Sequence, residues 1–202
     1  MALGKHRSVG EFLPIIKYDA RVGYFLLCDR VRDSDDVWRT EQTNIEREDF
    51  RAAFDLENVQ VGWIDFPSGS APDTKLVAVG EDWGDPPSKK HKLGVRLIIK
   101  MDDTIDGSVR ELMSTSVGLW AGIDKLHDAY VAGVKDHPDD VPVVVITDCI
   151  KTETSQGTSF QAVFAIEEWV PRPSDLPLAG IAPAGADKKK PARDNMNDEI
   201  PF

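Results

Sequence analysis

Apolar and polar residues alternate along several short segments, a pattern typical of β-strands that bury one face. In residues 57–66, for example, Val59, Val61 and Trp63 share one face. Turn-forming residues separate the segments, most clearly at 67–73, which are rich in Pro, Gly, Ser and Asp. Strands are predicted at residues 10–17, 23–31, 57–66, 75–80, 93–100, 141–151 and 159–170.

The hydrophobic period changes once along the chain, between residues 116 and 135. There Trp120, Ile123, His127 and Val134 recur at helical spacing. Ser114, Thr115 or Ser116 can cap the start of this helix, and His137 followed by Pro138 ends it. The sequence therefore predicts a mainly β protein with one helix.

The order of elements from residue 57 onward is three strands, one helix and two strands. This is the order of the five-stranded OB barrel, with its helix between strands 3 and 4. Residues 10–31 then form an additional N-terminal hairpin, and the polar residues 32–48 form a loop. OB folds bind oligonucleotides on strands 2 and 3 and on the loops joining strands 1–2 and 4–5, here residues 67–73 and 152–158.

The composition fits a globular domain rather than a disordered chain or a membrane protein. The chain has 202 residues, of which 41% are hydrophobic. No apolar run approaches the ~20 residues that cross a bilayer, and the N-terminus lacks the apolar stretch of a secretory signal. We therefore expect a soluble protein of the cytoplasm. Cys28 and Cys149 are too few and too isolated to predict a disulfide framework or a zinc site.

The composition shifts after Val170. Three prolines follow, then an Ala/Gly/Pro-rich stretch at 178–186 and three consecutive lysines at 188–190. Such a segment has too little apolar surface to offset the entropy cost of ordering it. We predict a folded domain over residues 1–170 and a disordered tether over residues 171–202.

The last residues of this tail are acidic and then apolar: Asp198, Glu199, Ile200, Pro201 and Phe202. A chance Ile-Pro-Phe at the terminus has a frequency on the order of one in ten thousand. Exposed apolar side chains on a disordered tail gain burial from a partner molecule, and the two carboxylates favour a basic rim around its pocket.

This ending resembles the acidic, amphipathic tip of bacterial single-stranded-DNA-binding proteins (SSBs), and the tether before it is similar too. The resemblance implies a sequence-tolerant protein that coats single-stranded DNA in a bacterial cell. It also implies that the tip recruits replication, recombination and repair proteins through the terminal Phe and its carboxylate. A larger OB domain with such a tail resembles the phage-encoded branch, and a homo-oligomer remains open as a further assembly.

The net charge of −11 requires that any DNA contact use a local basic surface. One basic stretch without acidic residues leads into the strand predicted at 93–100. All of its members except the first have the parity of one strand face, which would offer phosphates a basic track. The alternative is a solvated loop and a strand edge protected by lysines. The members are Lys89, Lys90, Lys92, Arg96 and Lys100.

Single-strand binding also needs aromatic rings on which bases stack. Trp83 is the first candidate, because it lies in a Gly/Pro loop next to the basic stretch, and Phe66 begins the strand 1–2 loop. Trp63 fits either base stacking or core packing. Lys75 and Lys151 are candidates for further phosphate contacts.

Two alternative functions remain. One is an adaptor whose β domain binds protein rather than DNA and that uses the same tip. The other is a nuclease, but residues 72–75, which come nearest to a nuclease motif, would need Asp73 to serve as two different carboxylates. We find no phosphate-binding Gly-rich loop and no metal-ligand spacing of His, so we expect no catalysis, metal or cofactor.

Overall fold

The structure is a computed structural model that describes residues 13–154 and 157–176. In this part of the chain, the protein is mainly β, with one α-helix, α1 (Val117–Gly133). The strands are β1 (Ile15–Asp19), β2 (Tyr24–Arg32), β3 (Trp38–Ile45), β4 (Arg51–Phe54), β5 (Gln60–Asp65), β6 (Asp73–Ala78), β7 (Lys92–Met101), β8 (Val109–Ser114), β9 (Asp140–Thr154) and β10 (Gly157–Pro171). Short 3₁₀ helices occupy Arg47–Asp49, Leu56–Asn58 and Val134–Asp136.

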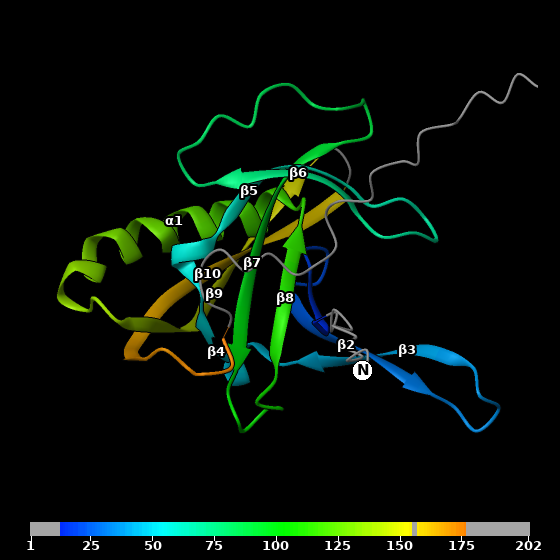
Figure 1. Cartoon of the computed structure of the whole chain (residues 1–202), viewed down its shortest axis with the longest axis horizontal. Coiled ribbons are helices and arrows are strands. Elements are labelled where there is room, and N and C mark those ends of the chain that lie inside the picture. Colours follow the sequence, from blue (N-terminus) through cyan, green and yellow to red (C-terminus); the bar gives the residue numbers. More distant parts are fainter. Residues whose placement is uncertain (1–12, 155–156, 177–202) are drawn as a thin grey trace, which may run out of the picture.

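The strands form one mixed sheet in the order β10-β9-β4-β7-β8-β1-β2-β3 (Figure 1). β5 also pairs with β7 and carries β6 on its other side. The pair of β1 and β8 is parallel, and the other pairs are antiparallel. Leu56–Asn58 interrupts what is effectively one long strand, because β4 and β5 pair with successive parts of β7.

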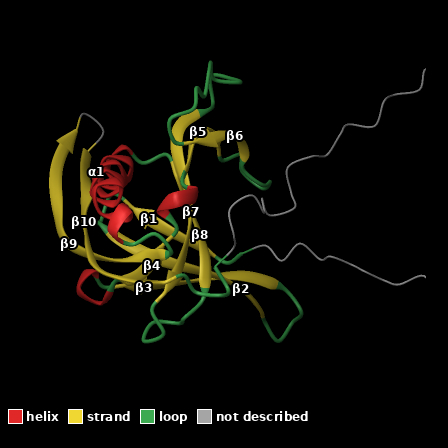
Figure 2. Ribbon diagram, turned by 60° about the vertical axis from the view of Figure 1, so that its left-hand side comes forward, coloured by secondary structure: helices red, strands yellow, loops and turns green. Residues whose placement is uncertain are grey.

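The single predicted helix is confirmed and lies against β10 (Figure 2). The Ser116 hydroxyl caps its start by accepting a hydrogen bond from the Leu119 backbone N–H at 3.4 Å. The close contact with β10 requires small residues. A Cβ on Gly122 would lie 2.4 Å from the backbone oxygen of Ala162, so Gly122 lets helix and strand approach.

A hydrophobic core fills the space between α1 and the curved inner face of the sheet. Phe25, Phe50, Phe54 and Phe164 form a ring cluster with centroid separations of 4.4 to 6.4 Å. Burying such aromatic side chains contributes roughly 1.5–3 kcal/mol each. Alternate residues of β7 join this core, which turns the intervening residues of β7 toward the outer face of the sheet.

A second, smaller core lies on the outer face and is covered by the chain after β10. Leu176 is 2% exposed and packs with Ala53, Val141 and Val143. Arg172 is joined to the buried Asp55 at 2.8 Å. The chain therefore stays packed on the sheet through Leu176, beyond the start predicted for the tether at residue 171. The predicted tip, residues 198–202, lies outside the described residues.

The predicted five-stranded order is wrong in two respects. The strand near 75–80 does not lie between the strands at 57–66 and 93–100; instead β5 lies between β6 and β7. A strand that the pattern did not reveal, β8, precedes the helix, so β7 and β8 are the two strands before α1. Residues 32–48 are also not a loop, because they contain β3.

The sheet is open in the ladder that the structure describes. β8 pairs with β1 rather than with β10, and β10 approaches the N-terminal hairpin through a hydrogen bond from the Phe160 N–H to the Ala20 oxygen at 2.6 Å. The predicted N-terminal hairpin itself, β1 and β2, is confirmed. None of the helices in the described part of the chain is long and apolar enough to span a membrane.

Candidate nucleic-acid interface

A tight turn before β7 presents the first basic residues of the candidate site. The Ser88 hydroxyl and His91 Nδ1 are joined by a 2.9 Å hydrogen bond. The backbone N–H of His91 also donates to the backbone oxygen of Ser88 at 3.2 Å. His91 is 8% exposed, so its burial anchors the turn. Lys89 and Lys90, between these anchors, are exposed and have no ion pair with any residue the structure describes.

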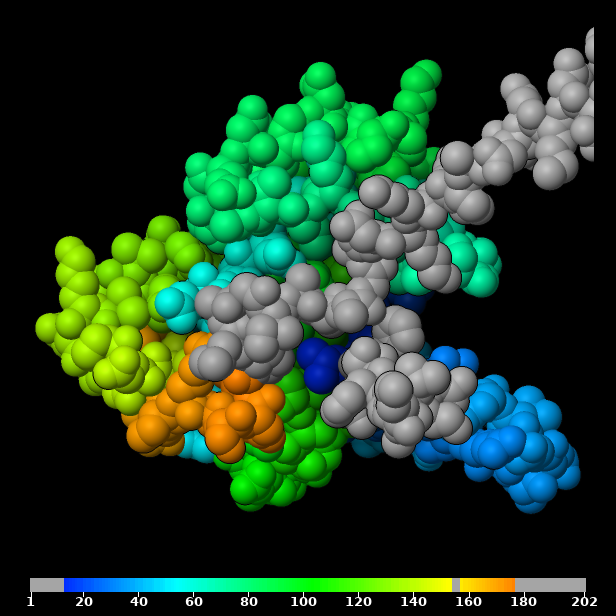
Figure 3. Space-filling view, viewed as in Figure 1, coloured from blue at the N-terminus to red at the C-terminus, as the bar shows by residue number. Residues whose placement is uncertain are grey.

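The loop ahead of this turn folds back onto the hairpin of β5 and β6. The Trp63 Nε1–H donates to the Gly84 oxygen at 2.8 Å. Lys75 is the cross-strand neighbour of Trp63, and its Nζ donates to the Asp85 oxygen at 3.2 Å. Trp63 and Lys75 therefore hold the loop that precedes the lysine turn. The space-filling view shows this region as one protruding lobe (Figure 3).

The structure changes the ranking of the aromatic candidates. Trp83 is not exposed as its loop suggested: it is half-buried, packs against the core and lies edge-on to Trp120 with centroids 6.5 Å apart. Phe66 is 49% exposed at the end of β5 and is the most accessible ring of the three candidates. Trp63 is half-buried, with its indole N–H already occupied.

The predicted parity of the basic residues on β7 is confirmed. The core side of the strand carries Val95, Leu97 and their alternates, whereas Lys92, Arg96 and Lys100 lie on the outer face. Two of these three cations have carboxylate partners, however, so they form a weaker basic track than the sequence indicated.

The partners come from two different elements. Arg96 Nε lies 3.1 Å from Glu111 of β8, and Arg96 Nη1 donates to Gln60 at 3.0 Å. Lys100 Nζ lies 2.6 Å from Asp175, in the segment after β10. Lys92, which is exposed, has no ion pair with a described residue. The cations available to an anionic ligand on this strand therefore concentrate near its start, beside the lysine turn.

Two further lysines complete the electrostatic picture. Lys17 is exposed on β1, and the parallel register of β1 with β8 brings it to the same outer face as Arg96. No sequence pattern indicates a role for Lys17, because this strand pair joins residues far apart in the chain. Lys151, by contrast, pairs with Glu153 at 2.8 Å, and that hydrogen bond lowers the pKa of the glutamate.

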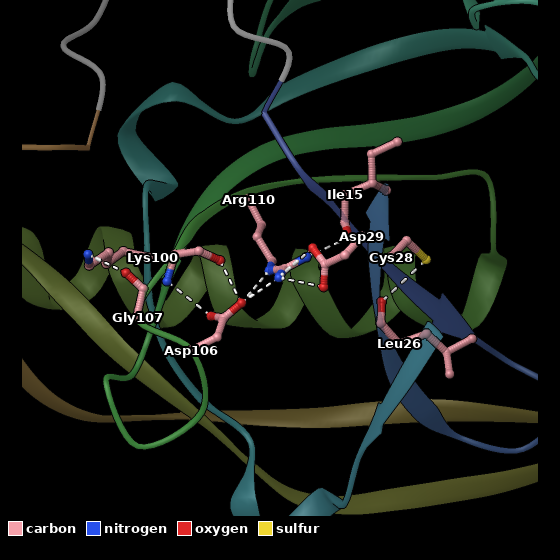
Figure 4. A network of polar contacts seen from close by, with 9 residues as sticks. Ile15, Leu26, Cys28, Asp29, Lys100, Asp106, Gly107 and Arg110 are labelled. Atoms are coloured by element: carbon pink, nitrogen blue, oxygen red, sulfur yellow. Dashed lines mark hydrogen bonds and ion pairs between the residues drawn. The ribbon is translucent and has the colours of Figure 1, made fainter. Parts of the chain in front are cut away.

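A buried ion network fixes β8 beneath this face (Figure 4). The guanidinium of Arg110, 3% exposed, lies 2.9 Å from Asp29 of β2 and donates from Nε to Asp106 at 2.9 Å. The carboxyl pKa of Asp106 is lowered: burial opposes ionisation, but bonds from Ser108 and Arg110 outweigh it. This network joins the N-terminal hairpin to the body of the sheet.

The site therefore combines two groups with different chemistry. One is a set of three cations without a carboxylate partner among the described residues, Lys89, Lys90 and Lys92. The other is an exposed ring, Phe66, just after the end of β5 that pairs with the start of β7. Among residues 13–154 and 157–176, no group of three or more His, Cys, Asp or Glu side chains is placed to hold a metal ion.

Comparison with protein families, with characterised proteins and with solved structures found no match to this chain. The functional argument therefore depends on the geometry above and on the sequence of the tail.

Proposed function

We propose that this protein binds single-stranded DNA without sequence preference and recruits replication, recombination or repair proteins through its C-terminal tip. The observation that carries the proposal is the strand connectivity. β4 and β5 together act as one strand that pairs with both β7 and β9, while α1 connects β8 to β9. This order of strands and helix resembles that of an OB barrel, and the likeness in order supports the proposal while the described sheet itself is open.

Under this proposed assignment, several candidate residues would lie on the elements that OB folds use for binding. With β4/β5 as strand 1 and β7 as strand 2, the strand 1–2 connection becomes residues 66–91. It contains the exposed Phe66, together with Lys89 and Lys90, which form no ion pair within the described part of the chain. The outer faces of β7 and β8 are then the strand 2–3 surface, and Lys92 lies at its edge.

The chemistry of this surface suits a flexible anionic strand. Lysine ammonium groups neutralise phosphates without requiring a fixed geometry, and an exposed ring stacks on any base. Neither contact reads base edges, so the binding is sequence-tolerant. The segment after Leu176 links this domain to the tip residues 198–202, whose resemblance to the SSB tip supports partner recruitment.

A paired charge reversal tests the DNA-binding surface. Lys89→Glu combined with Lys90→Glu should weaken binding to a fluorescent oligo-dT by at least about tenfold, because phosphate contacts supply most of the affinity of such proteins. The matched control is Lys125→Glu with Lys135→Glu, two exposed lysines on and just after α1 that make the same change in net charge. Equal affinity of both double variants would remove the lysine turn from the interface.

One observation favours a second candidate, an adaptor whose β domain binds protein. Arg96 and Lys100 are paired with carboxylates, and the chain is acidic overall. Under this alternative, the wild type would not bind oligo-dT, and neither would the lysine-turn variant or the control variant.

A further inference from the structure

The hairpin formed by β2 and β3 projects from the body of the protein (Figures 1 and 3). β3 is the last strand in the sheet order, so its outer edge pairs with no strand among the described residues. Every residue from Trp38 to Asn44 is exposed. A long exposed edge is a template for pairing with another strand unless its side chains prevent it.

The register of the hairpin shows which backbone groups of β3 face that open edge. At the turn, the Asp33 N–H donates to the Val37 oxygen at 3.0 Å. Hydrogen-bonded and non-hydrogen-bonded pairs alternate along an antiparallel ladder. The next hydrogen-bonded pairs toward the body are therefore Val31 with Arg39 and Asp29 with Glu41.

It follows that Arg39 and Glu41 turn their backbone groups toward β2. The residues between and beside them, Trp38, Thr40 and Gln42, turn their N–H and C=O groups outward. The open edge thus offers a regular series of donors and acceptors. Trp38 adds a ring that is 56% exposed, with Arg30 and Arg32 stacked over it at 5.7 and 5.8 Å.

We propose that β3 pairs antiparallel with β3 of a second copy of this chain, across a twofold axis at Thr40. In this register Thr40 faces Thr40 of the second copy, and Trp38 faces Gln42, each pair exchanging backbone hydrogen bonds. Arg39 faces Glu41 of the second copy, and the symmetry repeats this ion pair. Both charge pairs fall at non-hydrogen-bonded positions, where side chains are closest.

The charges select this axis over its neighbours. An axis at Gln42 would place Glu41 opposite Thr43 and Arg39 opposite Ile45, so both ion pairs would be lost. An axis at Arg39 or Glu41 would place like charges opposite each other, which is unfavourable. The alternation of Arg39 and Glu41 is therefore self-complementary rather than protective.

The charges of the hairpin also favour a second copy over a nucleic acid. Its turn carries Asp33 and Asp36, which pair with Arg39 and Arg32 respectively. Asp35 beside them is exposed and adds a negative charge that repels phosphate. This pairing of copies does not depend on the proposed DNA binding.

Sedimentation of the full-length chain over a range of concentrations tests the proposal. We expect a concentration-dependent dimer at roughly 100 µM, well above the Kd of a micromolar interface. Glu41→Arg and Arg39→Glu should each weaken the dimer by more than about tenfold, because each places like charges opposite each other twice. The combined exchange of both residues should restore it. A wild-type monomer at this concentration would overturn the proposal.

Thr40→Pro provides an independent test of the backbone contacts. Proline removes the outward N–H of Thr40 but spares the bonds to β2, so circular dichroism should stay unchanged while the dimer is lost. A dimer that persists in Thr40→Pro and in both charge variants would form elsewhere and would overturn the proposal. So would a monomeric wild type in which Trp38→Ala weakens oligo-dT binding, because that result assigns the hairpin to nucleic acid.

Discussion

The aromatic residues show how far a single residue can be interpreted from its sequence neighbours. Trp83 lies between Asp82 and Gly84, a context that indicates an exposed loop. Its loop folds back because distant residues, Trp63 and Lys75, bond to the backbone at Gly84 and Asp85. Sequence patterns report local preference, whereas contacts of this kind depend on the tertiary fold. The burial of Trp83 could therefore not be predicted from its sequence neighbours.

Trp83 and Phe66 should consequently respond to mutation in opposite ways. Trp83→Ala removes a ring packed against the core and Trp120, and should lower the free energy of unfolding by about 2 kcal/mol. Phe66→Ala should leave stability nearly unchanged but cost ~1–3 kcal/mol of oligo-dT binding through lost stacking. Thermal melts and fluorescence titrations measure both. An unaltered melting temperature for Trp83→Ala would show that this contact contributes little.

Arg110 of β8 is buried, and its loss should destabilise the protein more than the loss of an exposed cation. Its guanidinium pairs with two carboxylates, Asp29 of β2 and Asp106 in the turn between β7 and β8. Arg110→Ala leaves these carboxylates without their partner, and we expect a loss of about 3 kcal/mol of unfolding free energy in urea titrations. Arg21→Ala is the control, because its ion pair with Asp19 is at the surface and its loss should leave the unfolding midpoint nearly unchanged.

At the scale of elements, the sequence predicted the helix and the strands whose hydrophobic pattern is local. α1 has a helical stripe and a capping serine, and the hairpin of β9 and β10 has long apolar runs. β3 was missed because both of its faces are exposed from Trp38 to Asn44, so no alternation exists to detect. β8 was missed because a buried arginine, Arg110, breaks its apolar pattern.

Pairing between strands was harder to predict than the strands themselves. β6 follows β5 and precedes β7 in sequence, yet β5 lies between them in the sheet. Both arrangements satisfy the same hydrophobic pattern, and cross-strand contacts such as Val61 with Val77 and Val95 decide between them. The basic residues of β7 were identified from their spacing in the sequence, but the carboxylate partners of Arg96 and Lys100 come from non-local contacts that the spacing does not reveal.

The end of the folded domain can be tested by truncation. A chain that ends at Leu176 keeps the small outer core, whereas a chain that ends at Val170 loses Leu176 and the ion pair of Arg172 with Asp55. We expect the chain that ends at Val170 to have a free energy of unfolding lower by about 3 kcal/mol, the typical cost of removing a buried leucine. Equal unfolding midpoints for the two chains would contradict the packing of this segment.

At the scale of the whole molecule, the acidic net charge coexists with one local group of lysines. The net charge is −11, but Lys89, Lys90 and Lys92 form a local group without carboxylate partners among the described residues. An acidic body discourages non-specific adhesion to anionic surfaces, and in the proposed function the lysine turn is the surface that contacts phosphate. Carboxylates of the tip can compete weakly for the same lysines.

If the proposed function holds, the tip should act independently of the surface proposed to bind DNA. Removing Phe202 should abolish recovery of replication and repair proteins in a pull-down while leaving oligo-dT affinity unchanged or slightly higher. Loss of a buried aromatic anchor typically costs at least ~2 kcal/mol. Adding one Gly after Phe202 moves the carboxylate but keeps the ring, and should also weaken recruitment. Equal recovery by the full and shortened chains would separate the tip from partner binding.

The most direct test of DNA binding is a fluorescence titration of the full-length protein with oligo-dT across a salt series. If Lys89, Lys90 and Lys92 each neutralise a phosphate, the logarithm of the binding constant should fall with the logarithm of salt concentration with a slope of about −2, since each phosphate contributes ~0.7. Mixed-sequence strands should give a similar slope. No binding to oligo-dT at low salt, or binding that salt does not weaken, would contradict the account.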